Sequence, residues 1–127
     1  MTNDVERIGA GKYVLVTTFR KDGTPVPTPV WAVRDGDELI LWTEAHAGKV
    51  KRIRNNGAVE VAACSVRGKP SGPSVKGRAR VLDAEGTEQA RRLIKSKYWI
   101  LGRAMVTTST IRRGKDYTVG IAIRLGE

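Results

Sequence analysis

The chain has 127 residues, of which 40% are hydrophobic, and this combination predicts one folded domain and excludes a disordered chain. Lys and Arg number 23 against 13 Asp and Glu, so the formal net charge of +10 favours an anionic partner: nucleic acid, an acidic membrane face or a charged small molecule. The lone cysteine, Cys64, excludes an internal disulfide, and no apolar run is long enough to span a membrane. These features predict a cytoplasmic protein.

The first third of the chain predicts strands. Residues 1–9 are expected to form a flexible terminus, and β-branched and aromatic residues then predict strands over 13–20, 25–34 and 37–43. Asp-Gly pairs in "KDGTP" and "RDGDE" predict tight turns between them. Pro25, Pro27 and Pro29 cannot donate hydrogen bonds, so one edge of the middle strand must be unpaired, bulged or facing a ligand.

A cationic helix follows in "HAGKVKRIRNNG". Val50 and Ile53 lie three residues apart and can both face the core, while Lys51, Arg52 and Arg54 point away or to the side. The run Asn55-Asn56-Gly57 is a typical stop signal for a helix.

Three further strands and a second helix complete the predicted domain. The strands are expected over 58–66, 75–83 and 117–125, with mobile loops at 67–74 and 106–116. A helix with Thr87 as its cap is expected within 85–105, with Ala90, Leu93, Ile94, Lys97 and Leu101 on one face. Six strands with two helices predict a mainly β protein, a small barrel spanning 1–127 as one domain. Because a small barrel leaves little chain to cover strand edges, we expect it to form a homodimer.

The start of the first helix is a candidate anion site. Lys49 follows Gly48 in the first turn, where a cation opposes the helix dipole unless an anion neutralises both. Thr43, at the end of the preceding strand, can add a hydroxyl donor. The alternative is a solvated basic helix face.

The stretch "ELILWTEAHAGKVKRIRNNGAVEVAAC" resembles the split β-barrel of the pyridoxamine 5′-phosphate oxidase superfamily, which binds flavins. The resemblance rests on Trp42-Thr43, Gly48-Lys49, Ile53 and Asn55-Asn56-Gly57, in that order and spacing, and extends over about residues 10 to 125. The form "DGTPVPTPVW" is most similar to the branch that uses the deazaflavin coenzyme F420. The usual basic pair is reduced to Gly48-Lys49, so Lys51 or Arg54 is expected to supply the second phosphate cation.

The resemblance implies a hydride transfer between reduced F420 and an electron-poor small molecule, of the quinone, enone or lactone type. It implies a cofactor site formed by Val30, Trp31, Ala32, Trp42, Thr43, Gly48, Lys49, Lys51 and Arg54. In it, the main chain of Val30, Trp31 and Ala32 would bind the ring edge, and no residue is required as a catalytic acid or base. The basic supply of the helix, with Arg20 and Lys21, favours F420 with its glutamyl tail over FMN.

Several alternatives stay open. The chain could be an FMN-binding oxidoreductase, or a flavin or haem carrier without turnover. A basic nucleic-acid-binding barrel is less favoured, because no aromatic residue interleaves with "KVKRIR". His46 could act directly or only cap the helix, and Tyr98 and Trp99 could wall the acceptor pocket or belong to the core.

Overall fold

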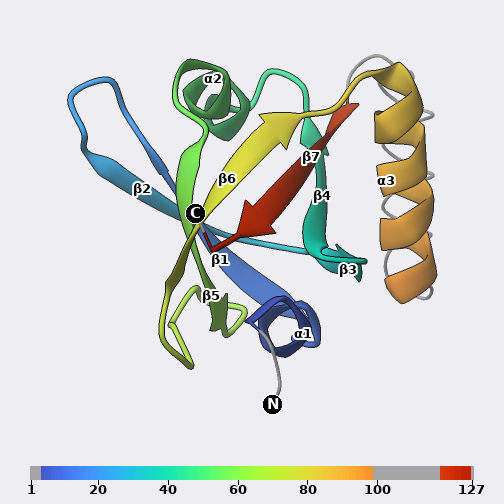
Figure 1. Ribbon diagram of the computed structural model, residues 1–127, viewed down its shortest axis with the longest axis horizontal. Coiled ribbons are helices and arrows are strands. Elements are labelled where there is room, and N and C mark those ends of the chain that lie inside the picture. Colours follow the sequence, from blue (N-terminus) through green and yellow to red (C-terminus); the bar gives the residue numbers. More distant parts are fainter. Residues whose placement is uncertain (1–3, 99–117, 127) are drawn as a thin grey trace.

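The computed structural model describes residues 4–98 and 118–126, and within these ranges the chain is mainly β. The elements follow in the order α1 (Asp4–Gly9), β1 (Tyr13–Phe19), β2 (Pro25–Val30), β3 (Val33–Asp35), β4 (Glu38–Glu44), α2 (Gly48–Asn55), β5 (Ala58–Cys64), β6 (Val75–Val81), α3 (Ala84–Lys97) and β7 (Thr118–Leu125). Figure 1 shows the strands curled around a common centre with the helices outside. The predicted split β-barrel is confirmed.

The two edge strands of the sheet are neighbours in sequence. The antiparallel strand order is β2-β1-β5-β6-β7-β4-β3, and only Trp31 and Ala32 separate β2 from β3. One extended segment therefore closes the barrel, pairing first with β1 and then with β4. The strand predicted over 25–34 is in fact broken at Trp31-Ala32, because the chain must leave one ladder before it joins the other.

The three prolines of β2 occupy alternate positions along its ladder with β1, and β2 is an edge strand. Pro25, Pro27 and Pro29 stand opposite Phe19, Thr17 and Leu15 of β1. Because proline has no N–H, the intervening residues of β2 must make the hydrogen bonds to β1. The outer edge of β2 therefore presents carbonyl groups at the proline positions and no proline N–H.

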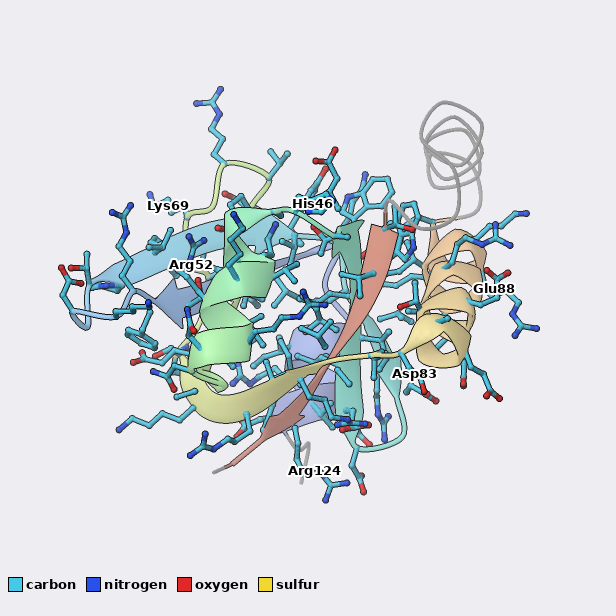
Figure 2. The ribbon with its side chains drawn as sticks, turned by 90° about the horizontal axis from the view of Figure 1, so that it is seen from above. His46, Arg52, Lys69, Asp83, Glu88 and Arg124 are labelled. Atoms are coloured by element: carbon cyan, nitrogen blue, oxygen red, sulfur yellow. The ribbon has the colours of Figure 1, made fainter. Side chains whose placement is uncertain are left out.

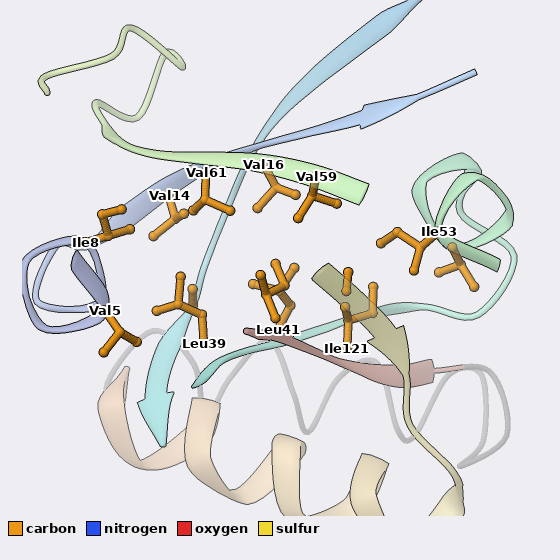
Figure 3. Close-up of a cluster of buried hydrophobic side chains, with 14 of the residues drawn as sticks. Val5, Ile8, Val14, Val16, Leu39, Leu41, Ile53, Val59, Val61 and Ile121 are labelled. Atoms are coloured by element: carbon orange, nitrogen blue, oxygen red, sulfur yellow. The ribbon is translucent and has the colours of Figure 1, made fainter. Parts of the chain in front are cut away.

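The core fills the barrel and is closed at both ends by helices. Inward residues alternate along the strands, among them Val14, Val16, Leu39, Leu41, Val59, Val61 and Ile121. Figure 3 shows Val5 and Ile8 of α1 at one end of this cluster and Ile53 of α2 at the other. Val50 and Ile53 are 0% and 4% exposed, as their spacing predicts.

The N-terminal segment corrects the sequence prediction. Residues 4–9 form α1, although a flexible terminus was expected over 1–9. Val5 and Ile8 are 6% and 0% exposed, so burial of two apolar side chains three residues apart stabilises this short helix. A single amphipathic turn is too short to be recognised as a pattern in the sequence.

Helix α3 covers the outer face of β4 and β7 (Figure 1). Its N-cap is Asp83, whose side chain accepts from the Gly86 N–H at 2.8 Å, and not Thr87 as predicted. The Thr87 hydroxyl instead accepts from the Gly120 N–H of β7 at 2.9 Å. A Cβ at Gly120 would lie 2.8 Å from the Ala90 Cβ, so glycine permits this close approach.

The turns and the loop after β5 complete the barrel. Gly23 and Gly36, in the two Asp-Gly turns, have φ of 90° and 63°, which confirms both predicted turns. The loop over 67–74 stays beside β5, since the Ser71 N–H donates to the Ala63 carbonyl at 2.9 Å. Trp99, Leu101 and the loop predicted over 106–116 lie outside the described residues. Within the described ranges, no helix has the length and apolar character needed to cross a membrane.

Candidate functional site

A pocket of about 450 Å³ lies between the corner at Trp31, the end of β4 and the start of α2. Five of the predicted site residues line it: Val30, Trp31, Trp42, Thr43 and Lys49. These residues lie at or beside the ends of β2 and β4 and at the start of α2. Closure of the barrel brings these segments together, because β2 and β4 end on the same side of the barrel. Tyr13, Ile94 and Thr118 add to the walls and were not predicted.

The other predicted residues lie elsewhere. Gly48 is the first residue of α2, while Lys51 and Arg54 are exposed and do not line this pocket. Arg54 instead lines a separate pocket of about 680 Å³ beside the start of α3. His46 is exposed in the turn between β4 and α2.

Ala32 differs from the expectation for a ring-binding residue. It is 0% exposed, its N–H donates to the Tyr98 hydroxyl at 3.2 Å, and its carbonyl accepts from the Lys97 ammonium at 2.6 Å. Both main-chain groups are therefore already bonded within the protein. Of the three residues predicted to bind the ring edge, 30–32, only Val30 and Trp31 line the pocket.

Two cations gather at the start of α2, and each is held by a threonine of a different strand. The Lys49 ammonium donates to Thr43 Oγ1 of β4 at 3.3 Å. The Arg52 Nε–H donates to Thr18 Oγ1 of β1 at 2.6 Å. Figure 2 shows Arg52 on the side of α2 that faces the β1–β2 ribbon. The two cations are thus fixed on either side of the helix start.

Glycine at position 48 allows Arg52 to lie against the helix start. A Cβ at Gly48 would stand 2.8 Å from the Arg52 Nη1 atom, closer than real Cβ contacts come. The guanidinium therefore folds back over the first turn of its own helix. Arg52 is therefore a further candidate for the second cation, beside the predicted Lys51 and Arg54.

The first turn of α2 itself carries no acidic side chain. The N-cap is Ala47, which provides no side-chain hydrogen bond. Burial lowers the pKa of Lys49 below its ordinary value and the Arg52 charge lowers it further, while Glu44 has the smallest effect and raises it. Two cations that repel each other beside exposed helix N–H groups form a suitable environment for a phosphoryl group.

Trp42 lines this pocket and also the pocket beside the start of α3. Its Nε1–H is buried, yet among the described residues no group accepts a hydrogen bond from it. A buried donor without a partner costs about 1 to 3 kcal/mol. An acceptor atom that reached this N–H would remove that cost.

Sequence reasoning counted Arg52 only in the general basic supply of the helix and did not identify Thr18. Thr18 is 1% exposed, a polar residue at an inward position of β1, where a hydroxyl must find a partner. The signal available in the sequence was the spacing of Gly48 and Arg52, four residues apart on one helix face. Thr18 itself, 34 residues away from Arg52, could be found only in the structure.

Solved structures with the same fold differ in the roles that their names give. An F420 reductase is 19% identical, with 100% of this chain and 97% of that chain covered and a TM-score of 0.63. A conserved hypothetical protein of Mycobacterium tuberculosis is 18% identical, with coverage of 100% and 82% and a TM-score of 0.72. The haem storage protein HutZ of Vibrio cholerae is 10% identical, with coverage of 91% and 82% and a TM-score of 0.67.

At these identities the likeness establishes the fold alone. No curated protein matches the chain. The pyridoxamine 5′-phosphate oxidase family, a family of flavin-binding and oxidoreductase-like proteins, matches residues 4–119. That match runs from α1 to the first two residues of β7 and includes every residue that lines the pocket, and the chain belongs to this family.

Proposed function

We propose that the protein is an F420-dependent oxidoreductase, which transfers a hydride between reduced F420 and an electron-poor small molecule such as a quinone, enone or lactone. The observation that carries this proposal is the pocket of about 450 Å³ whose wall includes Lys49 at the start of α2, with Arg52 on the same helix start. The family match and the fold shared with an F420 reductase support it.

The residues present fit a coenzyme that has a planar ring and a phosphoryl group. Lys49, Arg52 and the N–H groups at the start of α2 would hold the phosphoryl oxygens. The unpartnered Trp42 Nε1–H would donate to an acceptor atom of the ring system. The pocket is also lined by Trp31 and by the end of β2, whose main chain would meet the ring edge.

The chain's contribution to the reaction is binding, orientation and exclusion of water. The coenzyme, when bound, supplies the hydride chemistry. The indole rings of Trp31 and Trp42, with Ile94, form an apolar wall that excludes water from the ring. The cations at α2 fix the phosphoryl end, which sets the depth at which the ring enters the pocket.

The choice of F420 over FMN rests on the cations that a single phosphate group would not engage. One phosphate requires only Lys49 and Arg52, whereas Lys51 and Arg54 are exposed on the same helix. Arg20 and Lys21 line a shallow pocket of about 300 Å³ together with Asn55 and Asn56 at the end of α2. These cations suit the several carboxylates of a glutamyl tail, which FMN lacks.

The protein is further proposed to act in the cytoplasm as a homodimer. The outer edge of β2 offers no proline N–H for pairing with another strand. We therefore expect the dimer to form through a face of the barrel and not by extension of the sheet at β2.

Fluorescence titration of the protein with F420 and with FMN tests the proposal. We expect F420 to bind in the micromolar range or tighter and FMN more weakly. Lys49→Ala should weaken binding of both coenzymes by about 1.5 to 3 kcal/mol, the value of a charged hydrogen bond. Lys69→Ala, at an exposed site in the loop after β5, is the control and should bind as the parent does.

Each outcome decides between the candidates. Binding of FMN alone would favour the second candidate, an FMN-binding oxidoreductase or flavin carrier, which the family match also supports. If neither coenzyme binds, the oxidoreductase proposal is wrong.

A further inference from the structure

The last turn of α3 fixes the corner where the barrel closes. The Lys97 ammonium donates to the carbonyls of Gly9 and Gly11 at 2.8 Å each and of Ala32 at 2.6 Å. One side chain thus joins the end of α1 to the break between β2 and β3. These carbonyls belong to segments that have left their helix or ladder, so the ammonium satisfies acceptors that regular structure does not.

Tyr98 joins the same corner from the next position. Its hydroxyl donates to the Lys12 carbonyl at 2.7 Å and accepts from the Ala32 N–H at 3.2 Å. Burial raises the pKa of Tyr98, so the hydroxyl keeps its proton at neutral pH and remains a donor. The phenol ring is therefore held at its outer end by two segments of the main chain.

The held phenol ring lies flat against Trp31. The ring centroids are 4.3 Å apart and the planes differ by 7°. The Lys97 ammonium stands 5.2 Å from the Tyr98 centroid, within cation–π range. Ammonium, phenol and indole form a contiguous set, and the indole at its end is the member that lines the pocket.

We infer that Tyr98 is a positioning residue, which holds the Trp31 indole as a flat wall of the pocket and thereby sets its affinity for a planar heterocyclic ring. The inference rests on the proposed function only in that the ligand contains such a ring. A stacked indole has its plane fixed, whereas an unsupported one can rotate about its side-chain bonds. Binding to the fixed indole costs less ordering.

This role separates ring recognition from phosphate recognition. Trp31 and Tyr98 act at the corner of the barrel, and Lys49 and Arg52 act at the start of α2. Riboflavin is FMN without its phosphate, so its dissociation constant reports the ring site. The ratio of the riboflavin and FMN dissociation constants reports the phosphate site.

The test measures both quantities in matched variants of the full chain. In Tyr98→Leu, which loses the stacked ring, we expect riboflavin to bind about 5- to 10-fold more weakly with the riboflavin-to-FMN ratio unchanged. In Lys49→Ala the ratio should fall while riboflavin affinity stays the same. Leu93→Ala, on α3 but packed against the outer face of the sheet, is the control for loss of stability and should change neither quantity.

Two milder variants decide the question if Tyr98→Leu does not fold. Tyr98→Phe keeps the ring but loses both hydroxyl contacts, and Lys97→Met keeps the stem but loses the ammonium. Each should weaken riboflavin binding about threefold at constant ratio. Unchanged riboflavin affinity in the folded Tyr98 and Lys97 variants would overturn the inference, whereas a parent protein that binds no flavin or deazaflavin would overturn the proposed function.

Discussion

At the scale of single residues, the site depends on two cations whose mutual repulsion Glu44 offsets only in part. Lys49 and Arg52 are anchored by Thr43 and Thr18, so neither ammonium nor guanidinium can move far into solvent. Holding them costs Coulomb repulsion, which lowers the pKa of Lys49 in addition to the effect of burial. An anion between the two would offset this cost, and the pair is therefore better understood as a binding device than as a source of stability.

The pKa of Lys49 leads to a prediction about pH. A bound phosphoryl anion favours the charged ammonium, so it raises the lowered pKa, and binding must take up protons at alkaline pH. We expect F420 affinity to begin to fall at a lower pH than that at which an ordinary lysine, with a pKa of about 10.4, loses its charge. Calorimetric titration in two buffers with different ionisation enthalpies measures the proton uptake.

Lys49→Arg is the matched variant for this experiment, since arginine keeps its charge at the pH at which lysine loses it. Its F420 affinity should depend less on pH, whatever its absolute value. A variant with the same pH dependence and the same proton uptake as the parent would show that another group titrates.

Trp42 permits a second prediction at this scale. Trp42→Phe removes the unpartnered buried Nε1–H and keeps an aromatic ring in the wall of the pocket. Loss of the unpartnered donor should not lower the stability of the free protein. F420 should bind about 1 kcal/mol more weakly, because one hydrogen bond to the coenzyme is lost. Thermal unfolding and fluorescence titration measure the two effects. Unchanged affinity would mean that the donor does not contact the coenzyme.

At the scale of elements, the helices hold the pocket in place from three directions. Helix α2 supplies its cations, the end of α3 holds its corner, and α1 closes the end of the barrel that the Lys97 bonds also reach. Because the Gly9 carbonyl is one of the Lys97 acceptors, α1 contributes to the geometry of the corner and not only to the core.

Helix α1 should therefore contribute strongly to stability. Ile8→Ala removes a side chain that is 0% exposed and should lower the free energy of unfolding by about 2 to 5 kcal/mol. Arg7→Ala, which breaks only a partly exposed ion pair with Asp4, should cost less than about 1 kcal/mol. Urea unfolding compares them, and equal stability of Ile8→Ala and parent would contradict the packing of α1.

At the scale of the whole molecule, charge is distributed unevenly with respect to the pocket. The inner pair at the start of α2 consists of Lys49, which lines the pocket, and Arg52, which lies against Gly48 without lining it. Lys51 and Arg54 are exposed on the same helix. At 0.1 M salt, exposed charges interact over about 10 Å, and at greater separations or higher salt their interaction is largely screened. The inner pair is suited to a phosphoryl group and the outer cations to a longer anionic chain.

The double variant Lys51→Ala/Arg54→Ala tests this division. We expect it to lose about 3- to 10-fold in F420 affinity at about 50 mM salt, with little change for FMN, since each exposed ion pair contributes up to about 1 kcal/mol. At about 500 mM salt the difference from the parent should largely disappear. Equal losses for F420 and FMN would mean that the outer cations do not bind the tail.

The sequence by itself determined the strands other than the break between β2 and β3, both Asp-Gly turns, the cationic helix and the barrel, because alternation and turn preferences act between near neighbours. It also led to five residues of one pocket, since β2, β4 and α2 each carry a local signal. Only the tertiary structure decided that Arg52 completes the cation pair, that α1 is packed, and that Ala32 is already bonded. Those facts depend on contacts such as that of Lys97 with Ala32, 65 residues apart, which no local pattern encodes.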